Sequence, residues 1–194
     1  MPQRCVLMFH AQNRPGIIAA ITTALAELGG DMFEASQTVV NEHLTMIIAA
    51  NFPDHRQPEV IIQHLSDAGR AYGLSVSFAP RVESQAPKSR DTTRMFLHLS
   101  GKDAPGLLRG ICAFLAGQNV DILDLRARKN EDSTNFEATL ELDVPTLIKA
   151  FELQHDLDDW GFLNGLHMQL FSKMEMIPDS GVIAGYGLHY QPVS

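Results

Sequence analysis

Two kinds of hydrophobic pattern occur along this chain, and each occurs twice in the same order. Short apolar runs at Cys5 to His10 and at Met95 to Leu99 have the length and composition of buried strands. Each run is followed by a segment in which apolar residues recur every three or four positions, which predicts a helix with one buried face. The residues of these two stripes are Ile17, Ile18, Ile21, Leu25 and Leu28, and then Leu107, Leu108, Ile111, Phe114 and Leu115.

The turn between the strand and the helix carries residues that commonly start helices. Asn13 and Asp103 are suited to cap the helix N-terminus with a side-chain oxygen. Pro15 and Pro105 then fall in the first helical turn, where the missing backbone N–H has no cost. We therefore expect Asn13 and Asp103 to be the N-cap residues of the two helices.

An alternating pattern after each helix predicts an antiparallel hairpin with one face in water. In the second copy the residues expected to share one face are Leu123, Leu125 and Ala127. A second helix is predicted over 58–72 and 145–160, and a closing strand over 74–78 and 166–171. The order strand, helix, strand, strand, helix, strand predicts an α+β fold of two ferredoxin-like βαββαβ domains. Each should have a four-stranded antiparallel sheet in the order 4-1-3-2, with its helices on one face.

The chain is an internal duplication. The six residues from Asn13 recur from Asp103 at an offset of 90, and Gly73-Leu74 recurs as Gly165-Leu166 at an offset of 92. Two additional residues in the second hairpin turn account for the change of offset. We expect a first domain at 1–80, a polar linker at 81–93, a second domain at 94–176 and a C-terminal extension at 177–194.

The charge of the chain argues against several partners. The formal net charge is −8, of which residues 1–90 contribute −1 (seven basic, eight acidic) and residues 91–194 contribute −7 (eight basic, fifteen acidic). Such a chain would be repelled by a phosphate backbone, so no direct nucleic-acid binding is expected. The apolar run from Cys5 to Phe9 is too short to span a membrane, so no membrane contact and a cytoplasmic location are expected.

The sequence offers little reactive chemistry. It contains no HExxH, GxSxG or GxGxxG motif. Cys5 and Cys112 lie far apart without metal-ligand spacing, and the eight histidines form no close helical pair. We therefore predict no catalytic residues, no metal site and no cofactor.

The repeated turn is the one feature with binding potential. A helix N-terminus offers unpaired N–H groups and the positive end of the helix dipole, which attract carboxylates. Gly16 and Gly106 would let a ligand approach the backbone, and Asn13 or Asp103 could meet the ammonium group of an amino acid. In the alternative interpretation, these residues only cap a helix and let it pack on the sheet. The residues alone leave both interpretations open.

The sequences Asn-Arg-Pro-Gly-Ile at 13–17 and Asp-Ala-Pro-Gly-Leu at 103–107, each between a strand and a helix, resemble the ACT-domain family. The resemblance implies binding of a small amino acid, such as glycine or serine, and signalling to a partner protein. The first copy departs from the family in having Asn13 for the usual acidic residue, and the second has Ala104 for a common arginine. The ligand-binding residues implied are Asn13, Arg14, Gly16, Ile17, Asp103, Gly106 and Leu107.

Three functions follow from the resemblance. The first is a non-catalytic regulator that binds an amino acid and acts through a regulatory partner protein, as a homo-oligomer. The second is a stand-alone regulatory subunit of an enzyme of amino-acid or folate metabolism. The third is a structural oligomerisation module that binds no ligand.

The outward positions of the two predicted sheets differ. Where the second copy has Glu137, Thr139 and Glu141, the first has Thr45, Ile47 and Ala49. An apolar face of this kind usually meets another surface. We expect it to be covered by the C-terminal segment, by the second domain or by another subunit. The C-terminal segment has apolar residues of one parity, namely Val182, Ala184, Tyr186, Leu188 and Tyr190.

Overall fold

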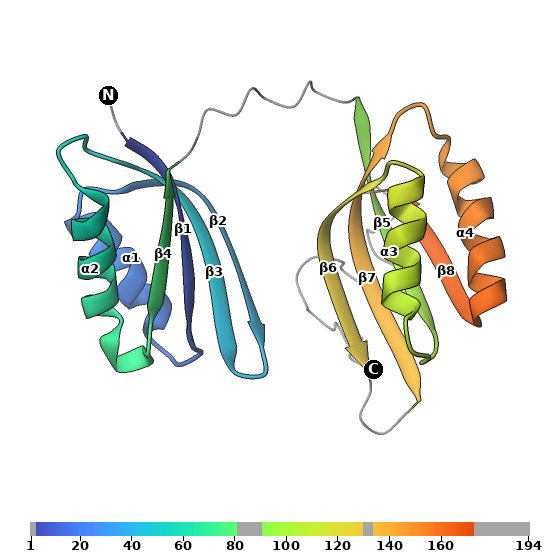
Figure 1. The fold of residues 1–194 in the computed structure, drawn as a ribbon, viewed down its shortest axis with the longest axis horizontal. Coiled ribbons are helices and arrows are strands. Elements are labelled where there is room, and N and C mark those ends of the chain that lie inside the picture. Colours follow the sequence, from blue (N-terminus) through green and yellow to red (C-terminus); the bar gives the residue numbers. More distant parts are fainter. Residues whose placement is uncertain (1–2, 81–90, 130–133, 173–194) are drawn as a thin grey trace, which may run out of the picture. The chain divides into compact units, whose positions relative to one another are not determined.

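The computed structural model describes residues 3–80, 91–129 and 134–172, which fall into two compact units on either side of a division between Pro87 and Lys88 (Figure 1). The elements of the first unit are β1 (Gln3–Gln12), α1 (Ile17–Glu27), β2 (Asp31–Val40), β3 (His43–Phe52), α2 (Pro58–Ala68), the 3-10 helix η1 (Arg70–Tyr72) and β4 (Ser75–Pro80). Those of the second are β5 (Thr92–Lys102), α3 (Leu107–Gly117), β6 (Asp121–Lys129), β7 (Asn135–Pro145), α4 (Ala150–Asn164) and β8 (Leu166–Ser172).

Each unit is one four-stranded antiparallel sheet with its helices on one face (Figure 1). The strand orders are β2-β3-β1-β4 and β6-β7-β5-β8, which is the predicted 4-1-3-2 order in both units. The predicted α+β fold with two ferredoxin-like domains is therefore confirmed. In both units the strand that precedes the first helix is an inner strand of the sheet. The turn that follows it therefore lies at the end of an inner strand, with other strands on both sides.

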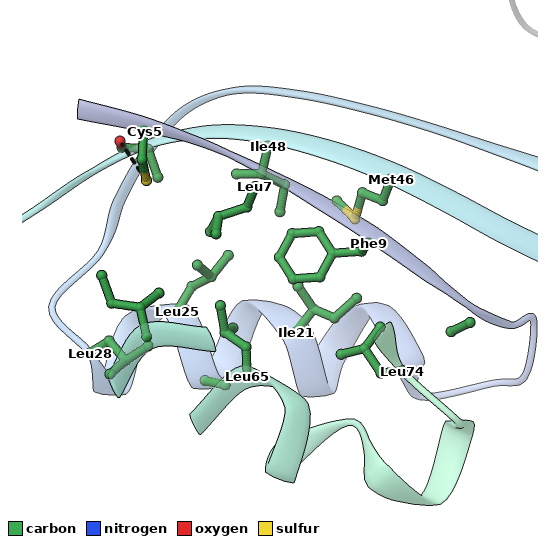
Figure 2. Close-up of a cluster of buried hydrophobic side chains, with 14 of the residues drawn as sticks. Cys5, Leu7, Phe9, Ile21, Leu25, Leu28, Met46, Ile48, Leu65 and Leu74 are labelled. Atoms are coloured by element: carbon green, nitrogen blue, oxygen red, sulfur yellow. Dashed lines mark hydrogen bonds between the residues drawn. The ribbon is translucent and has the colours of Figure 1, made fainter. Parts of the chain in front are cut away.

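The first core lies between the sheet and helices α1 and α2. Alternate residues of β1, Cys5, Leu7 and Phe9, are fully buried and face Ile21 and Leu25 of α1 (Figure 2). Full burial of a side chain of this size contributes about 1.5–3 kcal/mol. The period-two pattern of the strand and the 3.6-residue pattern of the helix therefore meet in one apolar layer.

The second core is built in the same way. Leu97 and Leu99 of β5 pack with Leu140 of β7 against Ile111 of α3 and Leu157 of α4, and all five side chains are fully buried. Because the two units share this layered arrangement, their equivalent positions can be compared directly.

Three sequence expectations about element boundaries are wrong. The first helices begin at Ile17 and Leu107, with Gly16 and Gly106 as their N-cap residues, so Asn13 and Asp103 are not the caps. The proline of each turn accordingly precedes the helix. The second helix of the second unit begins at Ala150, because β7 continues through Pro145.

A β-bulge changes the predicted alternation on β6. The register with β7 shifts between Ile122 and Asp124, so Leu123 is an extra residue in the strand. It is 43% exposed and does not share an alternating face with Leu125 and Ala127 as predicted. An equivalent shift occurs on β2 between Met32 and Glu34. The inserted residue leaves the ladder, which a period-two count cannot reveal.

The outer face of the first sheet is apolar, as the sequence indicates. Met8 is 42% exposed and Ile47 is 47% exposed on this face. The segment from Val182 to Tyr190 that was considered as a cover lies outside the described residues, so a covered Ile47 stays a prediction. No helix within the described ranges is both long and apolar enough to cross a membrane.

Candidate ligand-binding turns

Both strand-to-helix turns depend on a glycine with a left-handed backbone. Gly16 has a φ of 97° and Gly106 a φ of 88°. Residues with a side chain rarely adopt this conformation, so the turn requires glycine whether or not a ligand binds. The positive φ is therefore a reason for these glycines that is separate from close approach by a ligand.

Each turn is fixed to the hairpin beside it by one backbone hydrogen bond. The Asn13 N–H donates to the carbonyl of Glu42 at 2.7 Å, and the Asp103 N–H donates to the carbonyl of Thr134 at 2.6 Å. Neither α1 nor α3 has a side-chain cap among the described residues. The first N–H groups of both helices are therefore left without a side-chain acceptor, at a turn that is tied to the neighbouring hairpin.

In the first unit the side chain of Tyr72 lies against the turn. A Cβ added to Gly16 would lie 2.6 Å from the Tyr72 hydroxyl oxygen. Asn13 and Arg14 are exposed, and the Arg14 guanidinium donates to Gln12 Oε1 at 2.5 Å. Ile17 is buried in the core with 2% exposure, so its side chain is not at the surface. Close approach to the backbone at Gly16 is therefore obstructed by Tyr72.

The second turn is open and carries charge. Apart from Gly106 and its immediate neighbours in the chain, no described residue has an atom within 4 Å of the position that a Cβ would take on Gly106. Lys129 Nζ donates to Asp103 Oδ2 at 2.7 Å, and the two side chains are 61% and 31% exposed. Leu107 is buried with 7% exposure. The position equivalent to Tyr72 is Asn164, which instead donates to the Trp160 carbonyl at 2.8 Å.

The arrangement of the second turn suits a zwitterion. A carboxylate near Gly106 would meet the positive end of the α3 dipole, with Lys129 at the edge of the turn. An ammonium group would meet the Asp103 carboxylate. Neither Lys129 nor Tyr72 is among the site residues that the sequence predicts. Both come from elements outside the repeated motif, and neither has a counterpart at its equivalent position in the other copy.

Among the described residues, no three His, Cys, Asp or Glu side chains are grouped closely enough to hold a metal ion. Cys5 and Cys112 are free thiols. Burial raises the pKa of the Cys5 thiol to about 11, and its sulfur donates to the Ala50 carbonyl at 3.6 Å. A thiol in this environment is a poor nucleophile, because the thiolate is the reactive form.

The fold and the repeated turns define a class, that of tandem ferredoxin-like α+β domains. The ACT domain model matches residues 6–70. A UPF0237 protein of Corynebacterium efficiens is 33% identical over 82 residues, which are 42% of this chain and 88% of that protein. A UPF0237 protein of Methanosarcina acetivorans is 32% identical over 74 residues, or 38% of this chain and 80% of that protein. The chain therefore belongs to the family of the UPF0237 proteins and contains an ACT domain at residues 6–70.

Two solved structures resemble the whole tandem arrangement of elements. A protein of unknown function from Galdieria sulphuraria has a TM-score of 0.73 and 19% identity, over 88% of this chain and 98% of that one. A protein proposed to be a glycine cleavage system transcriptional repressor has a TM-score of 0.64 and 14% identity, over 88% and 96%. At these identities the likeness shows a shared fold.

Proposed function

We propose that this protein is a non-catalytic sensor that binds a small amino acid at the turn from Asp103 to Leu107 and signals to a partner protein. The observation that carries the proposal is the difference between the two turns. The Gly106 turn is open and has an adjacent carboxylate and ammonium, whereas Tyr72 lies over the Gly16 turn. The likeness to a repressor-like protein supports a partner that controls transcription, and two free thiols suit a cytoplasmic location.

The small size of the ligand limits the affinity. Small ligands reach at best about −1.5 kcal/mol per heavy atom, so a ligand as small as glycine, with about five, binds no tighter than roughly micromolar. A site of this affinity responds to changes in metabolite concentration. It would release its ligand readily, which suits a sensor.

The first test is ligand-dependent stability of the full chain. At a ligand concentration of about 100 times Kd, the second unit should be stabilised by about 2.7 kcal/mol. The only tryptophan, Trp160, lies in this unit, so its fluorescence reports the unfolding that the ligand should delay. Glycine, serine and the other common amino acids would each be screened. If none raises the midpoint at millimolar concentration, the sensor proposal fails and the structural-module alternative is favoured.

The second test locates the site. Asp103→Asn and Lys129→Gln should each weaken binding by about tenfold or more, since hydrogen bonds to charged groups contribute about 1.5–3 kcal/mol. Asn13→Ala in the first turn is the matched control and should leave the affinity unchanged. Loss of binding in the Asn13 variant alone would place the site in the first unit instead.

The partner is identified by copurification with and without the bound amino acid. A transcription factor whose recovery depends on the ligand would support the repressor-like function. An enzyme of amino-acid or folate metabolism would support the regulatory-subunit alternative. We also propose that the protein is a homo-oligomer, which sedimentation measures directly.

A further inference from the structure

Helix α4 and the turn before it carry the most exposed large apolar side chains of the described residues. Leu147 is 93% exposed, Phe162 87%, Leu163 81% and Phe151 68%. Exposed apolar side chains are ordinary when scattered singly, but these four lie on one helix and the turn before it. Together with the carboxylates described below, they form what we call the α4 surface.

The two phenylalanines lie on the same side of the helix. Phe151 and Phe162 are eleven positions apart, which is about three turns of 3.6 residues, or about 16 Å along the axis. Leu153 and Leu157 of the same helix are fully buried against the sheet. Helix α4 is therefore apolar on two sides, of which one packs on its own domain and the other faces outward.

The outward side of α4 is also acidic. Residues 149–164 contain four carboxylates and one lysine, a formal charge of −3 with histidine neutral. The lysine, Lys149, approaches Glu152 at 3.6 Å and lies 5.6 Å from the centre of the Phe151 ring. The four carboxylates are all exposed, and they are Glu152, Asp156, Asp158 and Asp159.

The fold itself does not require these apolar residues. At the offset of 92, the positions of Leu147, Phe151, Phe162 and Leu163 correspond to His55, Glu59, Arg70 and Ala71 of the first unit. All four of these are exposed as well. The same fold thus uses small or polar residues where the second unit has large apolar ones. A role in packing of the domain does not explain the difference.

We propose that the α4 surface is the docking site for a basic amphipathic helix of a partner protein. Apolar residues of such a helix recur at i, i+4, i+7 and i+11, a repeat that matches the separation of Phe151 and Phe162. Its lysines and arginines would face the carboxylates of α4. A second copy of this surface is disfavoured as the partner, because four carboxylates would then face four others. The surface does not include the Asp103 to Leu107 turn, so the inference is independent of ligand binding there.

The test uses the full chain and a fluorescein-labelled helical peptide of about 20 residues, with leucines at helical spacing and lysines elsewhere. Fluorescence anisotropy should show binding that weakens as salt rises, because the attraction between exposed charges is screened. Phe151→Ala and Phe162→Ala should each weaken binding by about tenfold or more, as aromatic anchors of interfaces commonly do. Asp158→Asn combined with Asp159→Asn should reduce both the affinity and its salt dependence. Val60→Ala on the outer side of α2 is the control and should have no effect.

Three results would overturn the proposal. The first is equal binding of a scrambled peptide of the same composition, or equal binding by the Phe151→Ala and Phe162→Ala variants. The second is a lower unfolding midpoint of those variants, which would mean that another segment of the same chain covers the surface. The third is conversion of an oligomer to monomers by the same substitutions, since the occupant would then be a second copy.

Discussion

The contact between Tyr72 and Gly16 predicts that the same substitution has different costs in the two turns. An alanine at a φ near 90° costs about 1–2 kcal/mol from backbone strain, and this applies equally to Gly16→Ala and Gly106→Ala. At Gly16 the new Cβ would also lie 2.6 Å from the Tyr72 hydroxyl oxygen. The Tyr72 ring packs against the core, so the hydroxyl can withdraw only if the ring shifts with it. Overpacking of this kind costs about 1–3 kcal/mol more.

A double-mutant cycle isolates the second contribution. Tyr72→Phe removes the hydroxyl oxygen and leaves Cζ as the nearest ring atom, 3.7 Å from the new Cβ, which is an ordinary contact. In the Tyr72→Phe background, Gly16→Ala should therefore cost only the strain of about 1–2 kcal/mol. The coupling energy between the two substitutions should be about 1–3 kcal/mol.

The assay is urea unfolding of the full chain. Far-UV circular dichroism follows the unfolding of both units, and tryptophan fluorescence follows the second alone, where the single tryptophan lies. A transition seen by circular dichroism and not by fluorescence is therefore that of the first unit. The free energy of unfolding would be obtained for the wild type, both single variants and the double variant, with Gly106→Ala as the strain-only reference. A coupling energy below about 0.5 kcal/mol, the usual limit of additivity, would show that Tyr72 does not obstruct the Gly16 turn.

Further predictions concern the cores and the thiols. Gly161→Ala should destabilise the second unit by about 1–3 kcal/mol in urea unfolding, because its Cβ would lie 2.7 Å from the backbone oxygen of Leu166. Leu97→Ala, at a fully buried position, should cost about 2–5 kcal/mol, and an unchanged midpoint would contradict the described core. At pH 8 a thiol reagent should label Cys112 before Cys5, as mass spectrometry of the labelled peptides would show, since burial raises the pKa of Cys5 to about 11. The folded chain holds this proton more tightly than the unfolded chain, whose thiol has an ordinary pKa of 9.0, so the resulting stability is present below pH 9 and lost as pH rises through about 11.

The fold could be predicted from the sequence because its information is local and present twice. Period-two strands such as the one with Leu97 and Leu99, and the helical stripe with Ile111, depend only on which neighbours along the chain are apolar. The duplication then confirmed each element by a second copy. The split βαβ arrangement, together with right-handed crossovers, predicts the strand order that is found in both sheets.

Element boundaries were less accessible. The expected caps Asn13 and Asp103 instead use their N–H groups in bonds to the neighbouring hairpins, and glycines with positive φ begin the helices. The sequence predicts a helix from Pro145, whereas pairing with β5 keeps the backbone extended through this residue. Backbone hydrogen bonds between segments that are distant in the sequence determine where these helices and strands end. Local residue propensities cannot predict such bonds.

The sequence by itself determined that two similar turns, each with a glycine close to the start of a helix, would lie at the ends of central strands. Only the tertiary structure decided how they differ. Tyr72 reaches Gly16 from η1, after the second helix, and Lys129 reaches Asp103 across 26 positions of the chain. The motif residues are near neighbours in sequence, so their pattern predicts the turn. The side chains that obstruct one turn and charge the other come from elements brought there by packing of the core, and no local pattern specifies that approach.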